Sequence, residues 1–491
     1  MKISDGTKEL IFNNPLVHRY CYSLLRPSQF WIYLTIYISV IILLLFINYS
    51  FHQIASDSVI DEEFYSKLYY QILGLEVVIL WIWATINSGS AIKNEVSDKT
   101  YDFFRLLPLS ALQKATGILV GKNFVALLLA GINLGFILLF GLLGKISGYF
   151  QVQVIVLLVS AALFANSIAL LSSNISPKRQ RKTSIFVWIL ILIFLGPFFL
   201  RILFLPLHIT PEIEKAERYL VGFYTIELPI LLLISFICVY FGFWNILGII
   251  RKFTFETEPL FSRKAALLFL LGFEIIATGL FLPHISENEM VVYLFWLVSL
   301  SPAVFIPVGS LKSFDSYLEC CGLLRSSSGS DKSMTSTLLV HSNLTLALGL
   351  FGIWAIFSVP MSVISRVDPS QFIFDMVVIF SFYLFLILLL ELHAVYSRTY
   401  NKIGLLLGFV GILYLLLPII LSFSLEKPTL VAYSLFGFFA HIFHPLETKG
   451  FEIHTSVCIV NTLLCIVPVW LISKGYFHIL AVRRKMRLGC E

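Results

Sequence analysis

Long apolar stretches constrain the fold of this chain more than any other feature of its sequence. Each can cross about 30 Å of hydrocarbon at about 1.5 Å per residue. With 58% hydrophobic and 13% charged residues over 491 positions, the chain has more apolar side chains than one water-soluble core can bury. The sequence therefore predicts an all-α, polytopic membrane protein with about twelve transmembrane helices, near 28–50, 68–90, 116–144, 149–173, 184–207, 220–250, 265–283, 290–311, 338–363, 372–397, 403–425 and 454–480.

The placement of Lys and Arg predicts the orientation of these spans. If the N-terminus is cytoplasmic and the spans alternate, most of the 35 basic residues face the cytoplasm, including clusters within 178–182, 251–264 and 483–487. Cytoplasmic loops of membrane proteins carry such an excess. We therefore expect a multi-pass protein of the cell (inner or plasma) membrane with both termini cytoplasmic. The short apolar piece 428–444 is expected to be re-entrant or interfacial.

Two sequence correspondences predict an internal repeat. The segment GFWNILGIIRK (242–252) and the segment GYFHILAVRRK (475–485) are identical at five of eleven positions and end the sixth and twelfth spans. Asn123 and Asn343 form part of a weaker match. We interpret the chain as two six-helix halves, preceded by an amphipathic N-terminal segment that lies along the inner face. The expected boundaries are 1–27, 28–250, a cytoplasmic link 251–264, 265–480 and a basic cytoplasmic tail 481–491.

The segment between the second and third spans, residues 91–124, carries most of the functional signal. It reads AIKNEVSDKTYDFFRLLPLSALQKATGILVGKNF, with Tyr101, Phe104 and Leu107 as an apolar stripe at helical spacing. Pro108 should end this helix, and a new one should begin near Ser110. Such a helix either lies at the lipid headgroups or presents a docking surface to a cytoplasmic partner.

This segment resembles the signature loop of export-type (type 2) ABC permeases, which places a coupling helix at 91–112. Lys99 departs from the family pattern, because glycine is usual before the threonine. The matching loop of the second half, 312–337, has lost the Pro-Leu-Ser and Gly-Lys features and is degenerate or differently specialised. The residues that the resemblance assigns to ATPase coupling are Glu95, Thr100, Asp102, Arg105, Pro108, Leu109, Gly121 and Lys122.

The resemblance implies a permease subunit that moves a lipid, glycan, peptide or drug-like substrate outward. The run from Gly117 to Lys122 imitates a phosphate-binding loop, but it lacks one spacer and the following Ser or Thr, and it opens a span. We expect Lys122 to anchor the membrane interface. We therefore expect ATP to be bound and hydrolysed by a separate soluble ABC ATPase that is a dimer. This chain is expected to carry no cofactor and to contact lipid but no nucleic acid.

Four glutamates fall within the expected spans and are candidate functional residues by default. They are Glu76, Glu227, Glu274 and Glu391. They could line a substrate path or respond to protons. Alternatively, they could form hydrogen bonds between helices, or be protonated with no role in transport. No spacing indicates a catalytic or metal site, so we do not expect this chain to be an enzyme.

Other functions remain open at the level of the sequence. A secondary transporter of the major facilitator type also has two parallel six-span halves, although it would have a short loop between the second and third spans. A membrane-embedded enzyme for lipid-linked substrates would require acidic or His clusters in loops, and none is evident. A regulator driven by an ATPase but without transport is a variant of the first hypothesis.

Overall fold

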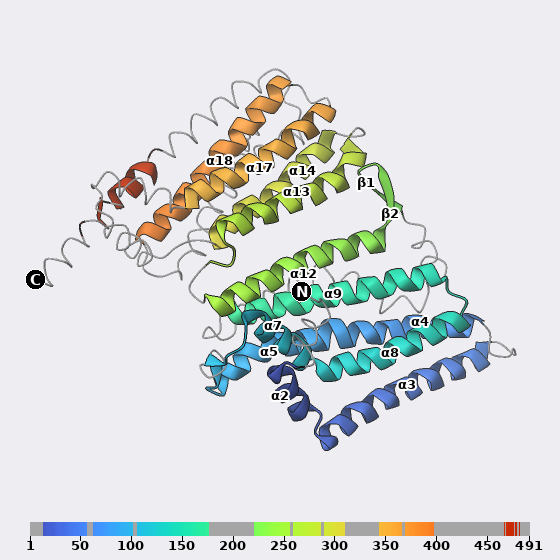
Figure 1. The fold of residues 1–491 in the computed structure, drawn as a ribbon. Coiled ribbons are helices and arrows are strands. Elements are labelled where there is room, and N and C mark those ends of the chain that lie inside the picture. The colour runs from blue at the N-terminus through green and yellow to red at the C-terminus, as the bar shows by residue number, and fades with distance from the viewer. Residues whose placement is uncertain are drawn as a thin grey trace, which may run out of the picture. The chain divides into compact units, whose positions relative to one another are not determined.

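The computed structural model describes most of the chain as helices (Figure 1). The chain forms two compact units, residues 1–221 with 227–260, and residues 222–226 with 261–491. Each unit is described by itself. The described residues are 13–55, 62–101, 106–175, 220–255, 259–285, 289–309, 343–365, 369–396, 466, 468–475, 477–478 and 481.

Seven helices of the described residues are long and apolar enough to cross a membrane, as expected for a multi-pass membrane protein. They are Gln29–Ser50, Glu62–Ser97, Phe124–Leu143, Gly148–Asn174, Ile230–Thr254, Arg263–Ile285 and Asn343–Ile364. Val291–Pro307 and Ile379–Leu392 are shorter apolar helices. The spans expected near 184–207 and 403–425, the piece 428–444 and the loop 312–337 lie outside the described residues. The count of twelve therefore stays a prediction.

The first unit is built from helical segments. A short helix outside the spans precedes the first of them, and the second span widens into a π-helix at its centre. The elements are α2 (Pro15–Leu24), α3 (Pro27–Ala55), α4 (Glu62–Val77), the π-helix η2 (Val78–Trp83), α5 (Ala84–Ser97), α7 (Ala111–Gly121), α8 (Phe124–Leu143), α9 (Gly148–Ile175) and α12 (Ile230–Thr254).

The π-helix η2 interrupts the regular hydrogen bonds of the second span, and its residues form hydrogen bonds with α9. Asn166 Nδ2 on α9 lies 3.4 Å from the carbonyl oxygen of Leu80, and Trp81 Nε1 donates to the carbonyl oxygen of Leu158 at 3.0 Å. α4, η2 and α5 nevertheless form one continuous rod of 36 residues. At about 1.5 Å per residue this rod is about 54 Å long, so it extends beyond the hydrocarbon layer.

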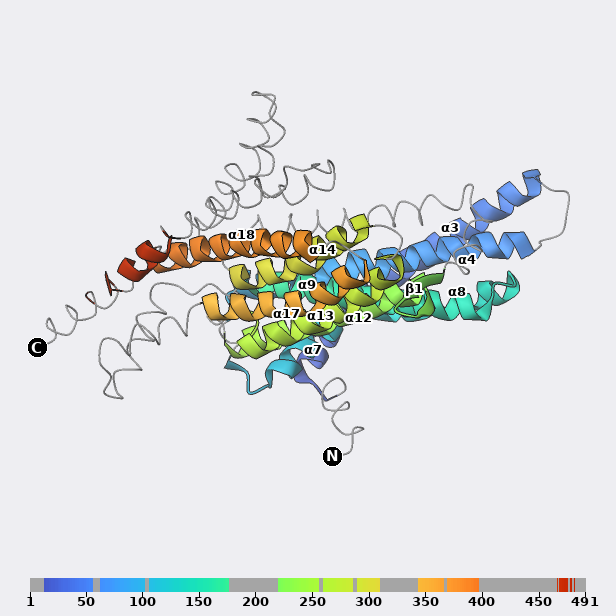
Figure 2. The ribbon, with the colours of Figure 1, turned by 90° about the horizontal axis from the view of Figure 1, so that it is seen from above.

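The second unit contains four long helices among its described residues, and they run alongside one another (Figures 1 and 2). They are α13 (Arg263–Ile285), α14 (Glu289–Gly309), α17 (Asn343–Ile364) and α18 (Pro369–Tyr396). Asn343 begins α17, and Asn123 directly precedes α8; both are buried, at 4% and 2% exposure. The two asparagines thus lie at the starts of two helices, and the repeat itself stays a prediction.

The predicted start of the sixth span, near residue 220, was wrong. Residues 220–229 form a two-stranded hairpin, β1 (Leu220–Phe223) and β2 (Ile226–Pro229), and the helix begins only at Ile230. A hydropathy window merges apolar strand residues with the helix that follows, so it cannot find this boundary. Glu227 consequently lies exposed in β2 instead of within a span. Apart from this hairpin, the described elements are helices, as the sequence predicts.

The tip of this hairpin belongs to the second unit and packs against α13. Pro283 has no N–H, so the carbonyl of Gly279 lacks its usual partner within the helix. The backbone N–H of Tyr224 donates to that carbonyl at 2.8 Å, and the Tyr224 hydroxyl donates to the carbonyl of Ile275 at 2.7 Å. The hairpin therefore completes the hydrogen bonding that the proline leaves open.

Candidate functional site

Glu95, in the last turn of α5, is the centre of the hydrogen-bond network that holds the loop between the second and third spans. Its side chain is only 8% exposed. The Tyr20 hydroxyl on α2 donates to Oε1 at 3.1 Å, and Arg19 Nη2 lies 3.3 Å from the same oxygen. The Thr100 hydroxyl donates to Oε2 at 2.5 Å. One carboxylate therefore joins the N-terminal helix, the end of the second span and the start of the loop.

The hydrogen bonds contribute more to this network than the ion pair. The Arg19 side chain is 46% exposed, and ion pairs of that exposure contribute about 0–1 kcal/mol. Burial, together with the nearby Glu95 carboxylate, raises the pKa of Tyr20, so its hydroxyl remains a donor at neutral pH. A buried hydroxyl left without its acceptor would cost about 1–3 kcal/mol. Tyr20 therefore fixes α2 against α5.

Lys99 adopts a left-handed conformation, with a φ angle of 57°. The N–H of Thr100 bonds to the carbonyl of Glu95 at 2.9 Å, and the N–H of Lys99 bonds to the carbonyl of Val96 at 3.2 Å. These two bonds form a Schellman motif, whose left-handed position favours glycine. Lys99 therefore occupies a position that glycine would fill without strain.

Replacing Lys99 with glycine is expected to stabilise the protein by about 1 kcal/mol, since glycine has no steric penalty at positive φ. The apparent melting temperature of the purified protein in detergent measures this change. Lys99→Ala is the matched control, because it also removes the charge but keeps the Cβ atom. Equal melting temperatures for the glycine and alanine variants would contradict the explanation.

α2 packs closely on α7 because two glycines one turn apart leave no side chain between the helices. A Cβ atom on Gly117 would lie 2.8 Å from Leu16 Cβ, and one on Gly121 would lie 3.1 Å from Val17 Cα. Asn14, fully buried, caps α2 by accepting from the N–H of Leu16 and donates its side-chain N–H to the carbonyl of Gln113 at 2.7 Å. The small residues allow the backbones to approach each other.

The predicted start of the new helix near Ser110 is confirmed. Ser110 and Gln113 form a capping box at the N-terminus of α7. The predicted start of the third span, near residue 116, was wrong, because α7 ends at Gly121 and the separate helix α8 begins at Phe124. A window of apolar residues cannot detect this interruption. Lys122 follows the C-terminus of α7, and its Nζ lies 5.5 Å from the centre of the Tyr20 ring.

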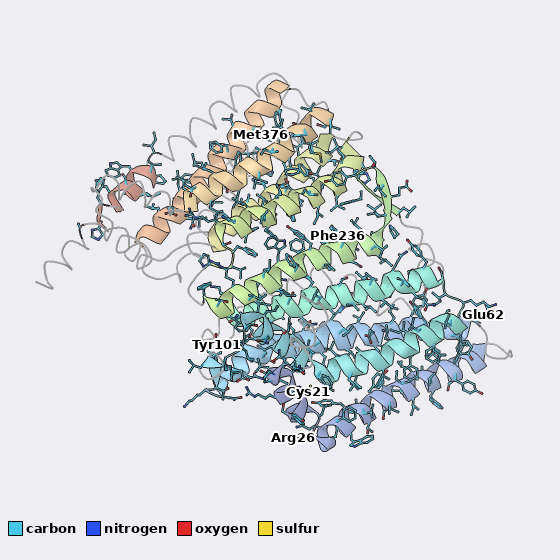
Figure 3. All side chains as sticks on the ribbon, viewed as in Figure 1. Cys21, Arg26, Glu62, Tyr101, Phe236 and Met376 are labelled. Atoms are coloured by element: carbon cyan, nitrogen blue, oxygen red, sulfur yellow. The ribbon has the colours of Figure 1, made fainter. Side chains whose placement is uncertain are left out.

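The remaining predicted coupling residues lie in or beside the loop. Asp102 and Arg105 are outside the described residues, whereas Pro108 is exposed and Leu109 is half-buried. Tyr101 and Leu107, from the predicted apolar stripe, pack against the core cluster that includes Ile92 and Ile118. The side chains of Tyr101 and Leu107 therefore pack against the protein core. Tyr101 and Cys21 appear at the same end of the first unit, where α2 and α7 lie (Figure 3).

Glu76 lies in a second polar cluster, inside the spans of the first unit. It is 2% exposed, and Asn133 Nδ2 donates to its Oε2 at 2.9 Å and to the carbonyl of Ile72 at 3.0 Å. A carbonyl can only accept, so this contact fixes the orientation of the Asn133 amide. The Tyr37 hydroxyl then donates to Asn133 Oδ1 at 3.0 Å. The cluster joins α3, α4 and α8.

The sequence reasoning missed Asn133 and Tyr37 because it considered only ionisable residues in spans. A neutral amide in a span is also costly without partners, so Asn133 could have been singled out. Of the other intramembrane candidates, Glu391 is 1% exposed and accepts from the backbone N–H of Asn343 at 3.3 Å. Glu274 is fully buried in α13. The structure does not bring Glu76, Glu274 and Glu391 into one site within either unit.

Comparisons with known protein families, with curated proteins and with solved structures found no match. The class that the structure itself defines is a helical, multi-pass membrane protein. Its described candidate site is the loop between the second and third spans, held by Glu95 against α2, which in turn packs on α7.

Proposed function

We propose that this chain is the membrane-spanning permease subunit of an ABC-type exporter, driven by a separate soluble ATPase, a dimer in our proposal. The Glu95 network is the observation that carries the proposal. A loop that transmits force must be attached firmly to the spans that it moves. Glu95 provides such an attachment, since donors from α2 and from Thr100 meet on one buried carboxylate at the end of the second span.

The rod formed by α4, η2 and α5 supports a lever mechanism. Glu95 lies near one end of this rod, and Glu76 lies within it, bonded to Asn133. A displacement of the loop would therefore reach the polar cluster inside the spans through one continuous helix. In this proposal the ATPase moves the loop, and the spans open a path for a lipid, glycan, peptide or drug-like cargo.

The exposed residues of the loop support a docking surface for the ATPase. Asp98 and Pro108 are exposed, and Leu106 is 82% exposed although it is apolar. An exposed leucine on a loop outside the spans can bury its side chain in a partner. In this proposal the loop and both termini face the cytoplasm, and the protein resides in the cell membrane.

Affinity purification of the tagged full-length chain from native membranes tests the proposal. We expect an ABC ATPase to co-purify with the wild-type chain, and Leu106→Asp to lower its recovery at least tenfold. Lys145→Ala is the control, because Lys145 pairs with Glu62, which lies at the opposite end of the rod from Tyr101 (Figure 3). Transport by the purified chain without any ATPase, driven by an ion gradient, would replace this proposal with a secondary transporter.

A further inference from the structure

Glu274 is a fully buried carboxyl group without a described partner. It lies near the middle of α13 and is 0% exposed. Neither of its carboxyl oxygens has a hydrogen-bond partner among the described residues. Glu76 in the first unit differs, because it accepts from Asn133. A buried polar group without a partner in a native structure requires an explanation, such as a bound ligand.

Two further buried hydroxyl oxygens in the second unit lack partners among the described residues, those of Thr278 and Ser358. Thr278 lies one turn after Glu274 on α13. Arg263 Nη1 lies 3.3 Å from Thr345 Oγ1, and a Cβ atom on Gly349 would lie 3.3 Å from Leu267. Both contacts join residues 82 positions apart, so α13 and α17 run parallel. This register places Ser358 at a depth between Glu274 and Thr278.

The described elements packed against α13 supply no cation at this depth. α17 has no titratable side chain, and the titratable side chain described on α14 is Tyr293. The basic residues of α13 itself, Arg263, Lys264 and His284, lie about 15 Å or more along the helix from Glu274. Tyr224 at the hairpin tip donates to the carbonyl of Ile275.

The titratable groups described on α18, and Lys474, have other partners, and His478 is exposed. On α18, the Tyr383 hydroxyl donates to the carbonyls of Ala303 and Ala347, and Glu391 accepts from Asn343. Lys474 Nζ lies 3.7 Å from the centre of the Trp470 ring. None of these described groups forms a hydrogen bond with the Glu274 carboxyl oxygens.

We propose that Glu274 is a proton-binding site within the second unit, with the hydroxyl oxygens of Thr278 and Ser358 at the same depth. An ionised carboxylate without a counter-charge is very unfavourable in apolar surroundings. A proton is the smallest ligand that removes this charge. It also makes the carboxyl group a donor, for which a hydroxyl oxygen is a suitable acceptor.

This site is independent of the proposed ATPase and has a direct consequence for conformational change. Any state of the protein that admits water to Glu274 would allow its proton to leave, because water stabilises the carboxylate. The two proposals can thus fail separately: the absence of an ATPase would leave the proton site intact.

Infrared difference spectroscopy of the full chain in lipid vesicles at pH 7 tests the proposal. Subtracting the spectrum of Glu274→Gln from that of the wild type should leave the carbonyl stretch of a protonated carboxylic acid. The control is Glu63→Gln, since Glu63 is 62% exposed and paired with Lys67, so its difference spectrum should contain carboxylate bands. Carboxylate bands in the Glu274 difference spectrum would overturn the proposal.

A second measurement needs no variant. A hydrophobic carbodiimide reacts with protonated carboxyl groups: the acid proton moves to one carbodiimide nitrogen, the carboxyl oxygen bonds to the central carbon, and the acyl group then shifts to nitrogen. The product is a stable N-acylurea, and nothing leaves. We expect mass spectrometry to find one adduct on Glu274 and none on Glu63 at pH 7. Wild-type protein without modification at Glu274 would contradict the proposal.

Discussion

Replacing Glu95 with alanine is expected to destabilise the protein by about 3 kcal/mol and, under the proposed function, to abolish ATP-driven transport. The change leaves the buried Tyr20 hydroxyl without an acceptor, which costs about 1–3 kcal/mol, and removes the side-chain bond from Thr100. The apparent melting temperature of the purified protein should fall by several degrees. Transport should fall further, because α2 and the loop would no longer move together with α5.

A double-mutant cycle distinguishes this network from a general effect of truncation. Tyr20→Phe alone should cost about 1 kcal/mol. In the Glu95→Ala background it should instead recover part of the lost stability, because it removes the buried hydroxyl that has no acceptor. Glu63→Ala is the matched control on the exposed surface, where a paired carboxylate contributes little. Additive effects of the Tyr20 and Glu95 substitutions would show that the two residues do not act together.

The sequence predicted the features of this site that depend on local chemistry. Ser110 could be recognised as a helix start because a serine three residues before Gln113 forms a capping box. The helix that contains the first span, α3, begins at Pro27, next to the start at residue 28 that the sequence predicted. The sequence also singled out Glu95 and its neighbour Thr100, but not the partners Arg19 and Tyr20, because those two contacts join residues far apart in the chain.

The errors have a shared physical cause. Hydropathy averaged over about 20 residues records apolar content but not backbone conformation. It therefore joined α7 to α8 across Lys122 and Asn123, and it merged the hairpin at Glu227 with α12. The π-helix η2 also left no signal, since hydropathy records the apolar side chains of VILWIW but not the hydrogen-bond pattern of their backbone.

Gly117 and Gly121 allow α2 to pack closely on α7. The resemblance of this segment to a phosphate-binding loop did not indicate that role. Their spacing of four residues places both glycines on one face of α7, against α2. Two glycines four residues apart indicate a nucleotide-binding motif only if a predicted strand precedes them. The same spacing fits helix packing wherever small residues face a neighbouring helix.

Replacing both Gly117 and Gly121 with alanine is expected to displace α2 and to destabilise the protein by about 2 kcal/mol, as overpacking does. The new methyl groups would overlap Leu16 Cβ and crowd Val17 Cα. Cys21 on α2 reports the displacement. Its thiol is partly buried, and burial raises its pKa, so its native alkylation should be slow. In a background that retains only this cysteine, we expect alkylation to accelerate at least fivefold.

The matched control replaces Gly131 and Gly135 with alanine. This pair has the same spacing on α8, and a Cβ atom added at either glycine would meet nothing within 4 Å. These substitutions should leave the alkylation of Cys21 unchanged, and they should stabilise α8 by up to about 1 kcal/mol per residue through helix propensity. The two double variants should therefore shift the melting temperature in opposite directions. Equal shifts, with equal alkylation rates, would show that the glycines of α7 do not set the position of α2.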